Sequence, residues 1–293
     1  MQDKYETLIL NQPQDYVLQI TINRPERRNA MNTQLGRDLL DLFSTLFLDA
    51  GDTRTVIITG ASRGIGAALS IELDKRGYRV AGLSRTGDPP IGCEDPSRFL
   101  LRRCDVTDEK QLRDSFAWVN EQTNEIKCLV NNAGLHTSSK SQDLDRNDFE
   151  RVMLINVTAV MLGCREIFPY FEKQGGGLIF NMGSSFGWIG APFNLSYCTS
   201  KAALGGLTRV LAAEWAKYKI RTLNIAPGYI SSDLNKEFME SDKIKKILAE
   251  AIPTGGPGTT ADVAKLISAL LVEDIPFLTG STIYLDGGQT FAH

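Results

Sequence analysis

From residue 55 onward, short β-branched runs alternate with amphipathic helical runs, and this alternation constrains the fold more than any other feature. The first strand, TVIITG, is followed by a helical run in which Ile65, Leu69 and Leu73 recur at four-residue spacing. The expected strands are residues 55–60, 78–84, 98–106, 127–134, 175–185, 220–228 and 281–288, and the expected helices are residues 64–77, 108–120, 148–171 and 197–218. This order predicts an α/β fold with a doubly wound parallel sheet.

A glycine-rich turn, TGASRGIG, joins the first strand to the first helix. Gly60 permits the tight turn, and Gly64 and Gly66 let the backbone approach a pyrophosphate closely. The N–H groups at the start of the helix then face the phosphate. The predicted nucleotide contacts in this turn are Gly60, Ser62, Arg63, Gly64, Ile65 and Gly66.

The end of the second strand bears on the choice of cofactor. An acidic residue there would bind the ribose hydroxyls of NAD, but this chain has Ser84-Arg85. With Arg63 in the glycine-rich turn, two guanidinium groups can hold a 2′-phosphate, which favours NADP(H). The alternative is that both arginines are ordinary solvated surface residues.

Tyr197 and Lys201 are four residues apart, so a helix places them on one face. An ammonium about 4 Å from the phenol is worth roughly 4 kcal/mol at an effective dielectric constant near 20, or about three pKa units. This pair could therefore act as a general acid and base near pH 7. A solvated helix face is the alternative, but Ser184 ends a predicted strand thirteen residues upstream, where it could bind a substrate carbonyl.

Residues 54–293 resemble a short-chain dehydrogenase/reductase, most closely the 3-oxoacyl-thioester reductases. The resemblance rests on TGASRGIG, CDV at 104–106, NNAG at 131–134, LINV around Asn156, the Ser184, Tyr197 and Lys201 set, NIAPG at 224–228 and the closing TGSTIYLDGG. These motifs occur in the family's order and at its spacing. The resemblance implies one Rossmann-like domain and, usually, a homotetramer.

The resemblance also implies roles. Tyr197 would be the general acid/base, Lys201 would lower its pKa and hold the nicotinamide ribose, Ser184 would orient the carbonyl, and Asn156 would hold a water in the proton relay. The further cofactor contacts would be Asp105 and Val106 near the adenine, Asn132, Ala133 and Gly134 beside the central strands, and Pro227, Gly228, Ile230 and Ser232 near the carboxamide. Ser232 stands where many relatives have threonine and keeps the hydroxyl.

Residues 1–53 form a predicted appendage, a hairpin followed by a helix. Its segment INRPERRNAMN, with the helix and VIITG strand that follow, resembles the beginning of an enoyl-CoA hydratase/isomerase (crotonase). The expected features are alternating Leu18, Ile20 and Ile22, a turn at 11–15, an apolar stripe of Leu35, Leu39, Leu42, Phe43 and Leu46, an N-cap at Asn32 and a stop at Gly51. Crotonase chemistry is expected to be absent. Arg24, Arg27 and Arg28 could retain contact with coenzyme A, although a structural role is favoured.

Composition excludes several classes of function. The formal net charge of −3 and the lack of a basic block argue against a nucleic-acid partner. The sequence contains no run of about 18 apolar residues, so a membrane span is not expected. Five widely spaced cysteines without a CxxC pattern indicate reduced thiols and a cytoplasmic protein. With two histidines in the chain, a metal site is not expected.

The sequence predicts NADPH-dependent reduction of a carbonyl, or the reverse, on a 3-oxoacyl substrate carried by CoA or a carrier protein. One alternative is a ketoreductase or alcohol dehydrogenase for small cyclic or aromatic substrates. Another is a non-catalytic NADP-binding assembly protein, against which the four-residue catalytic set argues. The predicted substrate pocket comprises His136, Trp188, Phe193 and Tyr229, beside residues 234–252.

Overall fold

The computed structural model describes residues 6–14, 17–27, 29–30, 32–49, 54–123 and 125–291. The chain divides into two compact units, Met1–Asp52 and Thr53–His293, and each is described separately.

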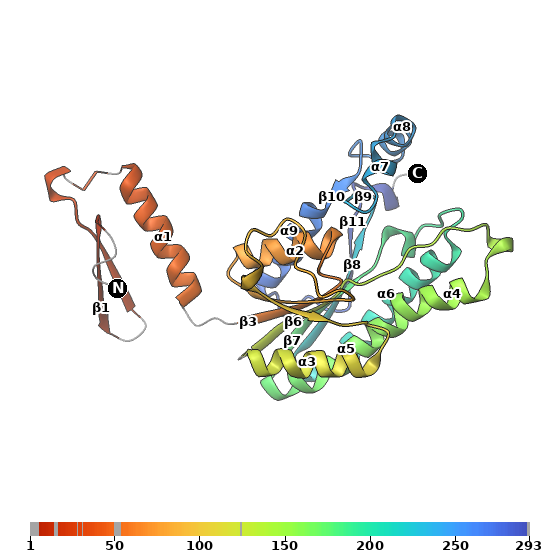
Figure 1. Ribbon diagram of the computed structural model, residues 1–293, viewed down its shortest axis with the longest axis horizontal. Helices are drawn as coiled ribbons and strands as arrows, with labels where there is room; N and C mark the ends of the chain where they lie inside the picture. The colour runs from red at the N-terminus through yellow and green to blue at the C-terminus, as the bar shows by residue number, and fades with distance from the viewer. Residues whose placement is uncertain are drawn as a thin grey trace. The chain divides into compact units, whose positions relative to one another are not determined.

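The larger unit is built on one seven-stranded parallel sheet with the order β11-β8-β7-β6-β3-β4-β5 (Figure 1). Its strands are β3 (Arg54–Thr59), β4 (Arg79–Ser84), β5 (Phe99–Arg103), β6 (Glu125–Asn131), β7 (Gly177–Met182), β8 (Ile220–Pro227) and β11 (Thr282–Leu285). The chain runs outward from β3 to β5 and then resumes on the other side of β3 with β6. The predicted doubly wound sheet is therefore confirmed, and its strand order reverses between β3 and β6, where such sheets bind ligands.

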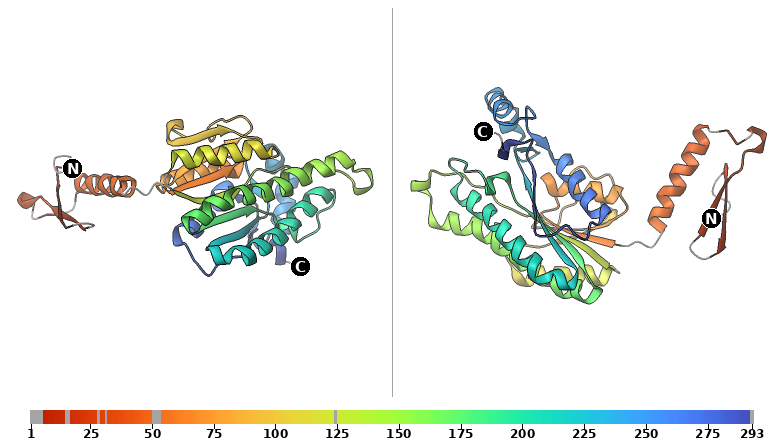
Figure 2. Two further views of the ribbon diagram at one scale, coloured as in Figure 1. Left: turned by 90° about the horizontal axis from the view of Figure 1, so that it is seen from below. Right: turned by 180° about the vertical axis from the view of Figure 1, so that it is seen from behind.

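Helices cover both faces of this sheet (Figure 2). One layer contains α2 (Gly64–Lys75) and α9 (Thr260–Glu273); the other contains α3 (Glu109–Gln122), α4 (Arg146–Met153), α5 (Ala159–Gln174) and α6 (Leu195–Trp215). The β-branched side chains of β3 alternate between the layers, because Val56 and Ile58 pack with Leu69 of α2, whereas Ile57 packs with Phe116 of α3. Burial on both faces explains why β3 reads as an unbroken apolar run.

The structure adds elements that the sequence reading missed. These are α9, the short helices α7 (Lys236–Glu240) and α8 (Asp242–Ala251), and the parallel pair β9 (Ile230–Ser231) and β10 (Gly258–Thr259). The signal for α9 was present, since Thr259 and Asp262 form a reciprocal capping box at its start.

The helix expected over residues 148–171 is longer and is interrupted. A π-helical turn, Leu154–Thr158, separates α4 from α5 and contains the fully buried Asn156. By length and composition the whole run Arg146–Gln174 could also cross a membrane, a possibility the sequence reading did not identify. Here α5 packs against the sheet, and its buried side chains include Ile167 and Phe171.

The smaller unit is a hairpin and a helix, as expected. Strands β1 (Leu8–Gln14) and β2 (Val17–Ile22) pair antiparallel, and α1 spans Thr33–Asp49. Buried Leu8, Leu10, Leu35 and Leu42 form its core, packed by Ile20, Ile22 and Leu39. The side chains of Leu18, Phe43 and Leu46, together with Gly51, lie outside the described residues.

Two details of this unit differ from or add to the expectation. The turn expected at residues 11–15 is wrong, because cross-strand pairing keeps β1 extended to Gln14; Asp15 lies outside the described residues. The expected N-cap is confirmed by a 2.8 Å hydrogen bond from the Leu35 N–H to Asn32 Oδ1.

The three arginines of the smaller unit have different surroundings. The Arg24 guanidinium donates to the Ala30 carbonyl, and the Arg24 N–H donates to Asn29 Oδ1 at 2.9 Å, so this residue shapes its own loop. Arg27 is exposed, and Arg28 lies outside the described residues. The bonds of Arg24 support a structural role for that residue.

Replacing Gly66 with alanine tests the close packing of α2 on the glycine-rich turn. The new Cβ would lie 2.1 Å from the Gly60 carbonyl oxygen and 2.6 Å from Asn132 Nδ2. Such overpacking costs about 1–3 kcal/mol, so the thermal midpoint should fall by several degrees. The control is Gly256→Ala, whose Cβ meets nothing within 4 Å and should change the midpoint little. Equal midpoints for the two variants would contradict this account.

Candidate active site

The glycine-rich turn lies where the sheet order reverses, at the carboxyl end of β3. Gly60 and Gly64 have φ values of 66° and 58°, a region that favours glycine. Asn132, after β6, donates from Nδ2 to the carbonyl oxygens of Thr59 and Gly60 at 3.0 and 3.1 Å. The conformation of the turn therefore depends on hydrogen bonds from Asn132 as well as on its own glycines.

The first backbone N–H of α2 is hydrogen-bonded to a carboxylate. The Gly64 N–H donates to Asp233 Oδ1 at 3.0 Å, and a Cβ on Gly64 would lie 3.4 Å from Leu234. A carboxylate oxygen at this N–H has the charge and hydrogen-bonding character of a nucleotide phosphate oxygen. The sequence reading missed Asp233, because only the tertiary fold brings residues 64 and 233 together.

The two arginines that are expected to bind the 2′-phosphate are exposed and lie in the segments that follow β3 and β4. Arg63 precedes α2, and Arg85 follows β4; both are exposed, and the described residues place no carboxylate within ion-pair distance of either. Ser84 is buried and its Oγ accepts a hydrogen bond from the Gly87 N–H at 2.9 Å. Two cations without acidic partners fit a bound phosphate.

The other expected cofactor residues are placed as follows. Asp105 Oδ1 accepts hydrogen bonds from the N–H and hydroxyl of Thr107, so this carboxylate stabilises the turn before α3. Ile230 is buried in the β9–β10 pair, and the Ser232 N–H donates to Asn235 Oδ1 at 2.8 Å. These two residues lie in the chain that leads to Asp233.

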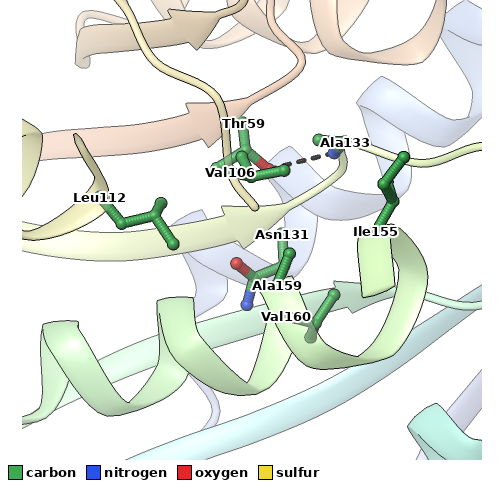
Figure 3. A pocket seen from close by; sticks show the side chains of 8 residues that line it. All are labelled: Thr59, Val106, Leu112, Asn131, Ala133, Ile155, Ala159 and Val160. Carbon is green, nitrogen blue, oxygen red and sulfur yellow. Dashed lines mark hydrogen bonds between the residues drawn. The ribbon is translucent and has the colours of Figure 1, made fainter. Parts of the chain in front are cut away.

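The cavities lined by described residues include two near this region. The smaller, of about 10 Å³, is lined by Thr59, Val106, Leu112, Asn131, Ala133, Ile155, Ala159 and Val160 (Figure 3). The larger, of about 410 Å³, is lined by Ile230, Thr254, Gly255, Gly256, Pro257, Gly258, Asp262, Leu285, Asp286 and Gly287. Neither lining includes Tyr197 or Lys201. We therefore describe the candidate catalytic residues from their own distances and hydrogen bonds.

Tyr197 and Lys201 lie in the first turns of α6, as their spacing predicts. Lys201 Nζ lies 5.6 Å from the centre of the Tyr197 ring and donates to the Met182 carbonyl oxygen at 2.6 Å. Ser184, just after β7, lies beside the Tyr197 side chain, close enough to act on its pKa, and its Oγ accepts a hydrogen bond from the Phe186 N–H at 3.2 Å. The structure therefore brings Ser184, Tyr197 and Lys201 together from β7 and α6.

The electrostatics differ from the sequence expectation. Burial raises the pKa of Tyr197, and the neighbouring Ser184 side chain opposes this rise. Burial also lowers the pKa of Lys201 from 10.5 to about 8. The expected lowering of the Tyr197 pKa by a nearby ammonium is wrong for this structure, because desolvation outweighs other influences on a buried phenol.

Asn156 connects three segments. Its Oδ1 accepts from the Leu135 N–H at 2.8 Å, and its Nδ2 donates to the Leu135 carbonyl oxygen at 2.8 Å and to Ser200 Oγ at 2.9 Å. Ser200 Oγ in turn donates to the Tyr197 carbonyl oxygen at 2.8 Å. Asn156 thus ties the loop after β6 to α6, and the water expected beside it stays a prediction.

Aromatic side chains surround the Tyr197 ring. His136 meets it edge-on with ring centres 4.8 Å apart, and Phe186 lies 6.4 Å from Tyr197 and 5.5 Å from Tyr229. Two other predicted pocket residues, Trp188 and Phe193, are 70% and 55% exposed. Phe186 was missed, since nothing in the sequence distinguishes it from a packing residue.

His136 is held by a second missed residue. Its Nε2 lies 2.6 Å from Oδ1 of Asn194, whose Nδ2 donates to the Pro192 carbonyl oxygen at 2.8 Å. This bond connects the loop after β6 to the segment before α6. A second bond, from the Ser139 N–H to the Phe193 carbonyl oxygen, connects the same two segments.

Comparison with known proteins identifies the family. The family model described as short chain dehydrogenase matches residues 54–243. The chain belongs to the short-chain dehydrogenase family. Glucose 1-dehydrogenase of Gluconobacter oxydans is 34% identical over 245 residues, covering 81% of this chain and 92% of that protein.

Two further relatives of this short-chain dehydrogenase bear on its function. The 3-oxoacyl-[acyl-carrier-protein] reductase MabA of Mycobacterium tuberculosis is 31% identical over 241 residues, covering 82% of this chain and 94% of the reductase. The solved structure "ElxO with NADP Bound" superposes with a TM-score of 0.76 at 29% identity, covering 81% of this chain and 98% of that one. The short-chain dehydrogenase is therefore an oxidoreductase with a Rossmann-like fold, and a nicotinamide cofactor fits the glycine-rich turn.

The buried Lys201 predicts a pH dependence of stability. Between pH 8 and 10.5 the unfolded lysine holds a proton that the folded lysine has released, so Lys201 contributes a rise in the free energy of unfolding with pH across this window. Cys128 and Cys164 contribute a fall above about pH 9, because burial raises the pKa of both thiols. Each unit of pKa difference corresponds to about 1.4 kcal/mol. Lys201→Met should lose the contribution of this lysine, so its slope should be less positive than that of wild type, whereas Lys173→Met, at an exposed position of α5, should have the wild-type slope. Urea unfolding at several pH values measures the slopes; equal slopes for wild type and Lys201→Met would contradict the account.

Proposed function

We propose that this short-chain dehydrogenase uses NADPH to reduce a carbonyl to an alcohol, with a 3-oxoacyl thioester as the substrate class. The observation that carries the proposal is the grouping of Ser184 and buried Lys201 beside Tyr197, with Lys201 Nζ 5.6 Å from the Tyr197 ring centre, at the same end of the sheet as the glycine-rich turn. A protein that only bound a nucleotide would have no need of this set of groups.

In this proposal Tyr197 donates the proton to the carbonyl oxygen, and Ser184 orients that oxygen. With a pKa raised above 10 the phenol of Tyr197 carries its proton at pH 7, as a donor must, although the rise also makes it a weaker acid. Lys201 holds the nicotinamide ribose, and Asn156 positions α6. Bound NADPH supplies the hydride.

NADP preference is supported by Arg63 and Arg85, which are exposed and lack carboxylate partners among the described residues, and by Ser84 in place of an acid. A 2′-phosphate would gain charge-assisted bonds from both guanidinium groups. The NADP-bound relative described above is consistent with this preference.

The substrate class is supported by the MabA relative and by the aromatic rings near Tyr197: His136 and Phe186 pack against it, and Tyr229 packs against Phe186. The second candidate is a small cyclic alcohol or ketone. The Gluconobacter relative, a glucose dehydrogenase, favours it, as does the polar His136–Asn194 pair beside Tyr197.

Tyr197→Phe tests the chemistry. The variant keeps the ring but removes the transferable proton, so turnover should fall at least about 100-fold while NADPH affinity stays near that of wild type. The assay compares 3-oxoacyl-CoA and 3-oxoacyl carrier-protein thioesters with free cyclic ketones. Tyr218→Phe, which removes a hydroxyl next to Phe168, is the matched control and should stay active. Retained activity in Tyr197→Phe would exclude the mechanism, and faster turnover of cyclic ketones by wild type would exclude the thioester class.

Ser84→Asp combined with Arg85→Ala tests the cofactor preference. The carboxylate should repel the 2′-phosphate and accept the ribose hydroxyls, which shifts kcat/KM toward NADH. We expect the ratio of the two kcat/KM values to change at least about tenfold, or about 1.4 kcal/mol. A wild-type enzyme that already favours NADH would overturn the assignment of Arg63 and Arg85.

A homotetramer is also part of the proposal. Exposed apolar side chains on α5, α6 and the end of α9 support self-association; they include Met161, Val210 and Val272. The cytoplasmic location and the crotonase resemblance of the smaller unit stay predictions, as does contact between that unit and coenzyme A.

A further inference from the structure

We propose that Arg103 is a third cationic contact for the 2′-phosphate of NADPH, beside Arg63 and Arg85. This inference rests on the proposed NADP preference and names an additional specificity-determining residue. Arg103 belongs to none of the sequence motifs described above; it stands directly before the CDV motif at 104–106.

The register of the sheet sets the direction of Arg103. In the parallel β4–β5 pair, Arg103 lies opposite Ser84, and Arg102 lies opposite Leu83. Paired residues of adjacent strands point to the same face, and successive residues point to opposite faces. Arg102 therefore points to the α3 side, where its guanidinium lies 5.3 Å from the Trp118 ring centre, and Arg103 points to the other side with Ser84.

The face that carries Ser84 and Arg103 is the face of the glycine-rich turn. Gly82, two residues before Ser84, lies on this face, and a Cβ there would be 3.1 Å from Cβ of Ala61. Ala61 belongs to the glycine-rich turn itself. The side chain of Arg103 thus leaves the sheet on the side where the nucleotide is expected.

The loop that carries Arg85 lies directly on the backbone of Arg103. A Cβ on Gly87, whose φ is 76°, would be 3.3 Å from the Arg103 nitrogen and 3.6 Å from its Cα. Ser84 Oγ binds the Gly87 N–H at 2.9 Å, and the Cys104 N–H donates to the Ser84 carbonyl oxygen at 2.8 Å. These contacts fix the start of the Arg103 side chain beside the turn from Ser84 to Gly87.

Arg103 is exposed, and the described residues place no carboxylate within ion-pair distance of its guanidinium. Its neighbour Arg98, by contrast, is paired with Asp74 at 3.0 Å. Arg63, Arg85 and Arg103 thus lie at or just after the carboxyl ends of the neighbouring strands β3, β4 and β5, and none has an acidic partner among the described residues. A phosphate dianion is the ligand that such a group fits best.

Binding measurements on the full chain test this inference without relying on activity. The variants are Arg103→Gln and, as the matched control, Arg102→Gln, which removes the same charge from the opposite face of β5. Titration calorimetry compares adenosine 2′,5′-bisphosphate with ADP, and nucleotide fluorescence compares NADPH with NADH.

We expect Arg103→Gln to bind the 2′-phosphorylated ligands about five- to tenfold more weakly, with ADP and NADH affinities within about twofold of wild type. The loss should shrink at high salt, because ions screen an exposed contact. Arg102→Gln should bind all four ligands like wild type, and Arg103→Lys should recover part of the loss.

An equal loss for ligands with and without a 2′-phosphate would assign Arg103 to the part of the nucleotide that they share and overturn the inference, and so would no loss at all. A wild-type protein that binds NADH more tightly than NADPH would instead overturn the NADP preference on which the inference rests. The wild-type comparison and the variant comparison therefore separate the two failures.

Discussion

The contact between the β3 turn and the start of β6 is the constraint on which the rest of the larger unit depends. Asn132 bonds the carbonyl oxygens of Thr59 and Gly60, and Gly66 lies so close to Gly60 that no side chain fits between them. This contact brings the glycine-rich turn over the point where the strand order reverses. The phosphate-binding end of α2 and the groups on β7 and α6 consequently share one edge of the sheet.

Burial of a lysine is the second physical feature with functional consequences. Lys201 is 6% exposed, and its ammonium donates to the Met182 carbonyl oxygen, which offsets part of the cost of removing the charge from water. Its position is fixed by α6, whereas Asn156 in the π-helical turn ties α6 to the loop after β6. π-helical turns are frequent at functional sites, and this one places a buried amide where a regular helix would direct it elsewhere.

The cationic group around Ser84 illustrates how a sheet combines residues that the sequence keeps apart. Arg63, Arg85 and Arg103 belong to three different connections or strands, and pairing of β4 with β5 places Ser84 opposite Arg103. The same pairing directs Arg102 to the opposite layer, where it packs over Trp118. Two adjacent arginines thereby have different surroundings for a purely geometric reason, the alternation of side chains along a strand.

Local patterns in the sequence determined the seven strands of the main sheet, the helices that pack on it except α9, the glycine-rich turn, and the placing of Tyr197 and Lys201 on one helix face. These features depend on spacing and on backbone preferences. Helix α9, the interruption at Asn156, and the extension of β1 to Gln14 depended on packing and cross-strand pairing. The bond from Gly64 to Asp233, the contacts of Phe186 and Asn194, and the raised pKa of Tyr197 were decided only by the tertiary structure. Hydrogen bonds across long stretches of chain and desolvation exist only once distant segments are brought together, so no local pattern encodes them.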